Sequence, residues 1–190
     1  MASGGADVPV TLIEGSMGAG KTITATAFVV DAYNKDPSTR IYANYHLYGV
    51  KYVYMRVSDM IKTLNDPKVF RNAKYVIDEA YIEGECRRGN NPLTVMLTEV
   101  SQQMRKRKIE LYIIVQNGRF LDWRFKWIMT RRIVCKYNEK TFRVKLIIKD
   151  MIKNVERKRS FWAPQYWKYY DTDELPHIPK KMVDRALEWA

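Results

Sequence analysis

The feature that most constrains this chain is a glycine-rich turn between a short apolar strand and a helix. The turn reads Gly15-Ser16-Met17-Gly18-Ala19-Gly20-Lys21-Thr22 and fits the pattern G-x-x-x-x-G-K-[ST] at every fixed position. Glycines let the backbone curl so that successive N–H groups point at phosphate oxygens. The following helix presents its positive N-terminal end to the same oxygens. The sequence therefore predicts that these eight residues bind a nucleotide.

Four side chains have the types that nucleotide chemistry needs. Lys21 can reach the β- and γ-phosphates, and the Thr22 hydroxyl can bind Mg²⁺. The apolar run Tyr75–Ile77 ends in two carboxylates, which are Asp78 and Glu79. Asp78 would hold Mg²⁺ through its water shell, since Mg²⁺ keeps several waters. Glu79 would act as the base that polarises the attacking water.

Gln116 follows another apolar run, Glu110–Val115. A polar side chain at this place can contact the γ-phosphate or the attacking water, as a glutamine does in other NTPases. A polar residue that simply begins a loop would give the same pattern. We include Gln116 among the predicted catalytic residues.

Apolar strands alternate with helices along most of the chain. Expected strands are 8–14, 40–44, 73–77 and 110–115, and expected helices are 21–33, 59–64, 92–104 and 121–129. This alternation predicts an α/β fold with a mostly parallel sheet and helices on both faces. Segments 132–136 and 142–149 alternate apolar and polar residues around a turn, which predicts a hairpin. Ligands of such sheets bind beyond the carboxyl ends of the strands.

We expect an ATPase domain at residues 1–150 and an extension at residues 151–190. The extension is rich in aromatic and basic residues; its aromatic residues include Phe161, Trp162, Tyr166, Trp167, Tyr169 and Tyr170. Aromatic side chains among basic ones can stack on nucleobases. Packing of the tail on its own domain or on a neighbour is the preferred interpretation.

The positive charge of the chain is concentrated in one region. The formal net charge is +12, and residues 101–160 contain 18 basic and 5 acidic residues. A surface for a polyanion has this character, although a solvated basic face would too. We therefore expect DNA to bind through residues 105–159, where Lys145, Lys149 and Lys153 are targets for charge reversal.

A basic cluster runs from Arg105 to Lys108. It could supply an arginine finger to a neighbouring subunit, bind nucleic-acid phosphates, or face solvent. Arg107 is the first candidate for the finger and Arg105 the second, while Arg87 and Arg88 compete with them.

The segments TLIEGSMGAGKT, RIYANYHLYGV, YVIDEAY and ELYIIVQN resemble the N-terminal ATPase domain of the zonular occludens toxin-like proteins. These are filamentous-phage assembly proteins of the FtsK/HerA superfamily, which also includes viral genome-packaging ATPases. The resemblance covers about residues 8–130. It implies a RecA-like P-loop sheet of the additional-strand, catalytic-glutamate class, ATP with Mg²⁺, and a ring of subunits that works on DNA or a virion.

The phage assembly proteins normally carry a membrane span after this domain, whereas no apolar run here approaches about 18 residues. We therefore expect a motor that translocates or packages DNA in the host cytoplasm or on the virion, unless the chain is an excised domain. Capsid or membrane proteins of the virion are further expected partners. The alternative is an ATP-gated assembly or extrusion factor that acts on a protein. A small-molecule kinase is disfavoured because Glu79 beside Asp78 suits activation of water, and the lack of an N/TKxD motif favours ATP over GTP.

Overall fold

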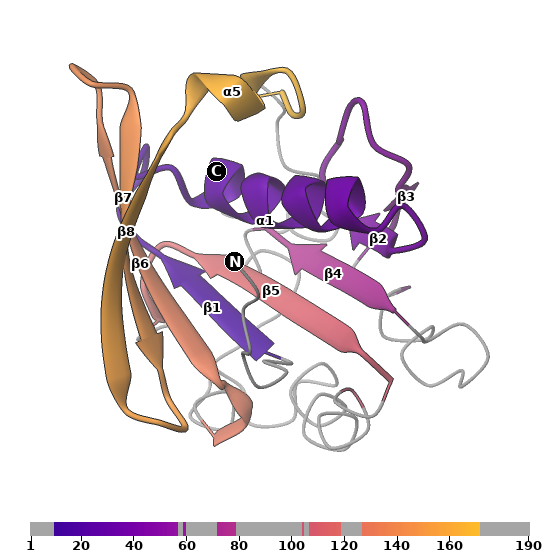
Figure 1. Cartoon of the computed structure of the whole chain (residues 1–190), viewed down its shortest axis with the longest axis horizontal. Coiled ribbons are helices and arrows are strands. Elements are labelled where there is room, and N and C mark those ends of the chain that lie inside the picture. Colours follow the sequence, from indigo (N-terminus) through magenta and orange to yellow (C-terminus); the bar gives the residue numbers. More distant parts are fainter. Residues whose placement is uncertain are drawn as a thin grey trace, which may run out of the picture.

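The structure is a computed structural model that describes residues 10–56, 59, 72–78, 104, 107–118 and 127–171. This part of the chain forms a mixed α/β fold with one sheet and a helix packed across it (Figure 1). The strands are β1 (Val10–Glu14), β2 (Arg40–Ala43), β3 (Val53–Tyr54), β4 (Ala73–Ile77), β5 (Ile109–Val115), β6 (Arg131–Asn138), β7 (Arg143–Asp150) and β8 (Val155–Trp162). The helices are α1 (Lys21–Lys35) and the short α5 (Pro164–Trp167).

The eight strands lie in the order β3-β2-β4-β5-β1-β6-β7-β8. The five neighbouring pairs from β3 to β6 are parallel, whereas the β6–β7 and β7–β8 pairs are antiparallel. The predicted mostly parallel sheet is therefore confirmed. Because β1, β2, β4 and β5 run in the same direction, the residues that follow them meet at one edge of the sheet, which we call the C-terminal edge.

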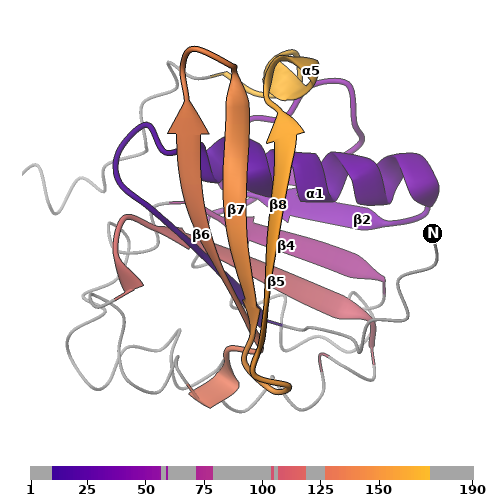
Figure 2. The same ribbon diagram turned by 60° about the vertical axis from the view of Figure 1, so that its left-hand side comes forward.

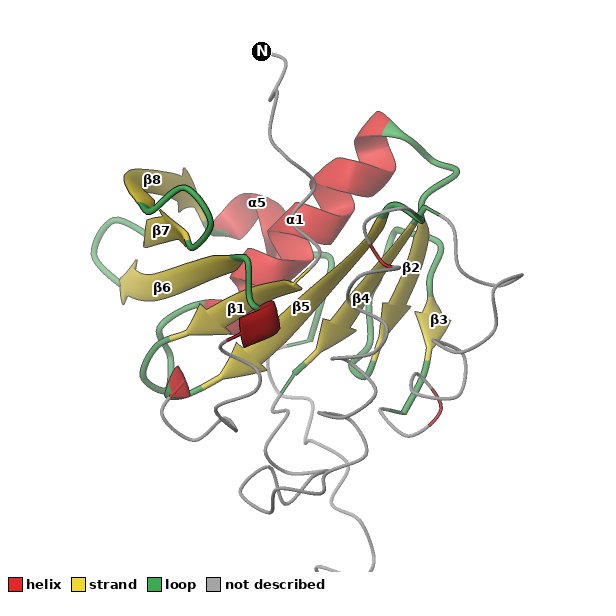
Figure 3. Ribbon diagram, turned by 90° about the horizontal axis from the view of Figure 1, so that it is seen from below, coloured by secondary structure: helices red, strands yellow, loops and turns green. Residues whose placement is uncertain are grey.

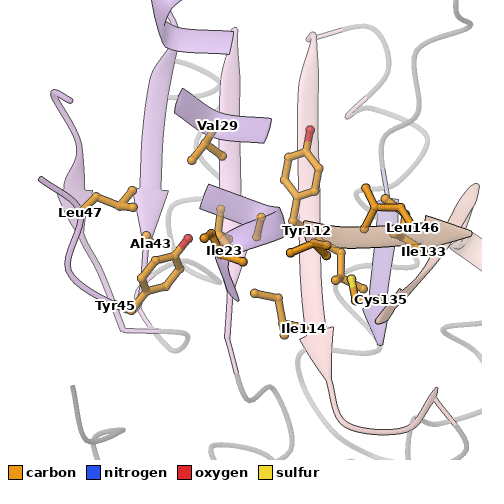
Figure 4. Packing of buried hydrophobic residues seen from close by; sticks show 14 of the residues in the cluster. Ile23, Val29, Ala43, Tyr45, Leu47, Tyr112, Ile114, Ile133, Cys135 and Leu146 are labelled. Carbon is orange, nitrogen blue, oxygen red and sulfur yellow. The ribbon is translucent and has the colours of Figure 1, made fainter. Parts of the chain in front are cut away.

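Helix α1 covers one face of the sheet. Ile23 and Val29 of α1 pack with Tyr112, Ile114 and other buried side chains of the strands (Figure 4). Burial of one such aliphatic side chain contributes about 1.5–3 kcal/mol. The short helix α5 also packs on α1 (Figure 3).

The opposite face of the sheet is also apolar and buried. Its core includes Leu12, Tyr75, Leu111 and Ile113, and Met104 packs among them. The helices predicted at 59–64, 92–104 and 121–129 lie outside the described residues apart from positions 59, 104 and 127–129. The predicted second layer of helices therefore stays a prediction.

Strands β6, β7 and β8 form a three-stranded antiparallel ribbon at one end of the sheet (Figure 2). In β7 the side chains alternate: Val144 and Leu146 are buried, and Lys145 and Ile147 are exposed. The sequence pattern predicted the β6–β7 pair but missed β8, because the run VERKRSFW is almost wholly exposed and lacks an apolar face.

After β8 the chain crosses over α1. The Tyr166 hydroxyl donates to Asp31 of α1 at 2.8 Å. The Tyr48 N–H donates to the carbonyl of Tyr169 at 2.9 Å, and Tyr170 bridges to Leu47. Residues 155–171 therefore pack on the same domain, while the boundary between 1–150 and 151–190 stays a prediction. In the described ranges, no helix is long and apolar enough to span a membrane.

Candidate nucleotide-binding site

The loop between β1 and α1 has the backbone conformation that a phosphate-binding loop requires. Gly18 and Gly20 have φ angles of 71° and 83°, in the left-handed region that side chains with a Cβ rarely adopt. α1 begins at Lys21, its first turn has no acidic residue, and Gly20 provides no side-chain cap. The N–H groups of the first turn of this helix are therefore available to an anion.

The ribbon packs directly against this loop. A Cβ on Gly15 would lie 2.8 Å from the carbonyl oxygen of Cys135 in β6, and one on Gly20 would lie 2.9 Å from Cγ2 of Val144 in β7. A Cβ on Gly18 would meet nothing within 4 Å. Two glycines thus allow close packing of the loop on the ribbon, and Gly18 serves the backbone turn alone.

Two side chains suited to binding Mg²⁺ come together at the C-terminal edge. The Thr22 hydroxyl donates to Oδ2 of Asp78 at 2.6 Å, although the two residues are 56 positions apart. Hydroxyl and carboxylate oxygens are the hard ligands that Mg²⁺ prefers. The donor set therefore fits the ion that the sequence predicted for these two residues.

Lys21 lies over the loop itself. Its Nζ donates to the carbonyl oxygen of Ser16 at 2.9 Å, and the contact is exposed to solvent. An ammonium held at an exposed carbonyl can exchange this neutral acceptor for a phosphate oxygen, because the negative charge of the phosphate adds a Coulomb attraction that a carbonyl lacks.

Asn44 is a site residue that our sequence analysis did not identify. It follows β2, and its side-chain amide makes two hydrogen bonds to the backbone of Asp78. The Asp78 N–H donates to Oδ1 of Asn44 at 2.7 Å, and Nδ2 of Asn44 donates to the Asp78 carbonyl at 2.9 Å. Asn44 therefore fixes the peptide that carries the Asp78 carboxylate. The signal was a polar amide directly after an apolar strand.

Glu14, the last residue of β1, anchors the opposite side of the loop. Its buried carboxylate accepts hydrogen bonds from the Gly118 N–H at 2.9 Å and from Nε of Arg132 at 2.8 Å. Nη2 of Arg132 bonds the same carboxylate. Glu14 thus joins the end of β1 to the segment after β5, which contains Gly118, and to the beginning of β6, which contains Arg132.

The remaining predicted residues differ in where they lie. Gln116 is at the C-terminal edge, and its carbonyl accepts a hydrogen bond from the Gly15 N–H at 3.3 Å. Arg107 lies just before the start of β5, at the opposite edge of the sheet, so it is remote from the P-loop of its own chain. Glu79 and Arg105 lie outside the described residues.

Two ionisable groups near the loop have shifted pKa values. Burial raises the pKa of the Cys135 thiol to about 11, partly offset by its hydrogen bond to Thr24. Burial also raises the pKa of Tyr170 to about 12, and the nearby Tyr137 and Asp78 add to the shift.

No protein-family model and no curated protein matches this sequence. Solved structures do match its fold. The N-terminal domain of zonular occludens toxin from Neisseria meningitidis has a TM-score of 0.63 at 14% identity, over 87% of this chain and 100% of that one. The genome packaging NTPase B204 from Sulfolobus turreted icosahedral virus 2, in complex with ATP-gammaS, has a TM-score of 0.59 at 15% identity, over 80% and 97%.

A KaiC-like protein from the archaeon Pyrococcus horikoshii is also similar, with a TM-score of 0.51 at 13% identity, over 80% of this chain and 83% of that one. At these identities the likeness concerns the fold, which is that of the P-loop NTPases. The resemblance to the zonular occludens toxin-like proteins and the viral packaging ATPases, predicted from four sequence segments, is confirmed at this level.

Proposed function

We propose that this chain is a Mg²⁺-dependent ATPase that drives DNA translocation or packaging in virus assembly. The observation that carries the proposal is the contact between Thr22 and Asp78 beside a loop with the phosphate-binding conformation. The fold it shares with a packaging NTPase that binds ATP-gammaS supports both the nucleotide and the process.

The order of the strands supports the catalytic-glutamate class. β5 lies between β1, which leads into the P-loop, and β4, which leads into Asp78. An additional strand at this position gives that class its name, and it brings Gln116 to the C-terminal edge between the two motifs. Gln116 can then contact the γ-phosphate or the attacking water.

The proposed reaction uses the residues in separate roles. Backbone N–H groups of the loop and the Lys21 ammonium bind the β- and γ-phosphates. Thr22 and Asp78 would hold Mg²⁺, which would neutralise phosphate charge. Glu79 accepts a proton from the attacking water, and the oxygen of that water forms a bond to the γ-phosphorus. At the same time the bond between the γ-phosphorus and the oxygen that bridges it to the β-phosphorus breaks. ADP and phosphate leave, and Glu79 returns the proton to solvent.

Two substitutions test these roles. Lys21→Ala should weaken ATP binding, because the backbone N–H groups alone must then offset the phosphate charge. Glu79→Gln should bind ATP normally but lose turnover by about 10²-fold or more, because an amide cannot accept the proton of water. Binding of a fluorescent ATP analogue and release of phosphate measure the two effects separately.

Glu139→Gln is the matched control for the same isosteric change, since Glu139 is exposed in the β6–β7 turn. It should turn over ATP like the wild type. Wild-type turnover in Glu79→Gln would remove Glu79 from the mechanism, and absence of ATP binding by the wild-type chain would refute the proposed ATPase.

A further inference from the structure

The ribbon formed by β6, β7 and β8 has one face that points away from α1. In β7 this outward face contains the exposed residues Lys145 and Ile147, whereas the buried Val144 and Leu146 point toward α1. The strand register places the partners of the exposed β7 residues on the same face. Its basic side chains are Arg132, Lys136, Arg143, Lys145, Lys149 and Lys158.

The charge on this face is almost all of one sign. Glu156 is the single acidic residue that the register places there, opposite Lys149. Arg132 is paired with Glu14, so the positive surface is made by the other five cations, of which Arg143 also donates a hydrogen bond to Ser160. They come from all three strands, which are about 4.8 Å apart, and residues two apart along a strand are separated by about 6.6 Å. The result is a closely spaced grid of positive charge.

One pair in the grid is electrostatically unfavourable without an anion. Lys136 and Lys145 are direct cross-strand partners in the β6–β7 register. Like charges placed directly opposite in a sheet destabilise it by up to about 1 kcal/mol. Both side chains are exposed, and among the described residues neither forms an ion pair. A bound polyanion would neutralise both lysines and so remove the repulsion between them.

We propose that the outward face of the ribbon binds the phosphate backbone of DNA. This inference rests on the proposed function, in which DNA is the track, and it narrows the binding region from residues 105–159 to one face of three strands. Phosphate contacts suit a motor, because they carry no sequence information and let every base pass. Trp162, half exposed on the same face opposite Arg143, adds a ring that can stack on an unpaired base.

The position of the ribbon also explains how DNA would influence ATP turnover. The same strands that present lysines outward contact the P-loop with their inward side, through the Cys135 carbonyl against Gly15 and through Val144 against Gly20. A shift of the ribbon on DNA binding therefore reaches the phosphate-binding loop directly. By linkage, ATP should change the affinity for DNA by the same factor as DNA changes the affinity for ATP.

Two double variants with equal charge loss test the face. Lys136→Gln with Lys145→Gln removes two cations from the outward face. Arg157→Gln with Arg159→Gln removes two exposed cations from β8 whose register partners, Ile148 and Leu146, belong to the inward side. The affinity of the full chain for a fluorescent random-sequence duplex is measured over a series of salt concentrations. A single-stranded oligonucleotide of the same composition serves as a second probe.

The outward pair should lower the slope of log affinity against log salt by about 1.8, which is about 0.9 for each lost contact with a duplex phosphate. The inward pair should leave the slope near that of the wild type. Thermal melting controls for folding, and at low salt the outward pair should melt no lower than the wild type, because a repulsion is removed.

If both double variants lose the same amount of DNA affinity and salt slope, DNA binding responds only to the net charge of the chain, and the proposal is overturned. Self-association of the outward pair with unchanged DNA affinity would also overturn it, and would show that the lysines keep this exposed face of the ribbon from aggregating. The proposal is also overturned if the wild-type chain does not bind DNA at low salt. Basal phosphate release without DNA is measured on every preparation, so a failure of the ATPase is distinguished from a failure of the DNA face.

Discussion

Replacing Asn44 with alanine should impair the proposed metal site, although the substitution changes none of the residues that are proposed to bind ATP. The Asn44 amide satisfies both the N–H and the carbonyl of Asp78, at 2.7 and 2.9 Å. Each hydrogen bond contributes about 1 kcal/mol net, and both groups are partly buried, so water can replace part of the loss. We expect Asn44→Ala to lower the free energy of unfolding by about 2 kcal/mol.

The functional effect should be larger than the loss of stability explains. Without Asn44 the Asp78 peptide can rotate, and the carboxylate moves away from the Thr22 hydroxyl. Residues that orient metal ligands typically change metal affinity or activity by about 10–100-fold. The Mg²⁺ concentration that gives half-maximal ATP turnover should therefore rise by about tenfold or more, measured by phosphate release at fixed ATP, while turnover at saturating Mg²⁺ largely recovers.

Tyr45→Phe provides the matched control. Tyr45 follows Asn44 directly, and its hydroxyl makes a buried 3.0 Å hydrogen bond to Thr26 of α1. It should lower the free energy of unfolding by about 1 kcal/mol and leave the Mg²⁺ requirement unchanged. If Asn44→Ala and Tyr45→Phe shift the Mg²⁺ dependence equally, the positioning role of Asn44 is wrong and the effect is one of stability.

Two further predictions concern the loop and its neighbours. Gly18→Ala and Gly20→Ala both place a Cβ at positive φ, at a cost of about 1–2 kcal/mol, but only at Gly20 does the new atom overlap Val144. Urea denaturation should therefore show that Gly20→Ala has a free energy of unfolding about 1–3 kcal/mol lower than Gly18→Ala. Equal losses of stability in the two variants would contradict the packing argument. Arg107, remote from its own P-loop, should act on a neighbouring subunit, so excess Arg107→Ala protein mixed with Glu79→Gln protein should regain ATP hydrolysis; no recovery in rings shown to exchange subunits would exclude Arg107 as the finger.

Much of the parallel sheet was predictable because its strands are buried on both faces. Such strands read as continuous apolar runs, and Ala73–Ile77 was predicted with the bounds that β4 has. The edge strands were not predictable in this way. β3 has two exposed residues, and β8 carries polar residues on both faces, so neither gives an apolar pattern. Their pairing depends on β2 and β7 rather than on their own side chains.

By itself, the sequence determined the P-loop, since its geometry arises from eight consecutive residues whose glycines set the local backbone. It also determined the carboxylate after β4, because a polar residue that ends an apolar strand must lie at the edge of the sheet. Only the tertiary structure decided which distant groups meet. Asn44 and Asp78 are 34 residues apart, and Glu14 and Arg132 are 118 apart. Their contacts depend on the order and register of the strands, which arise from packing of the whole sheet and leave no local signal.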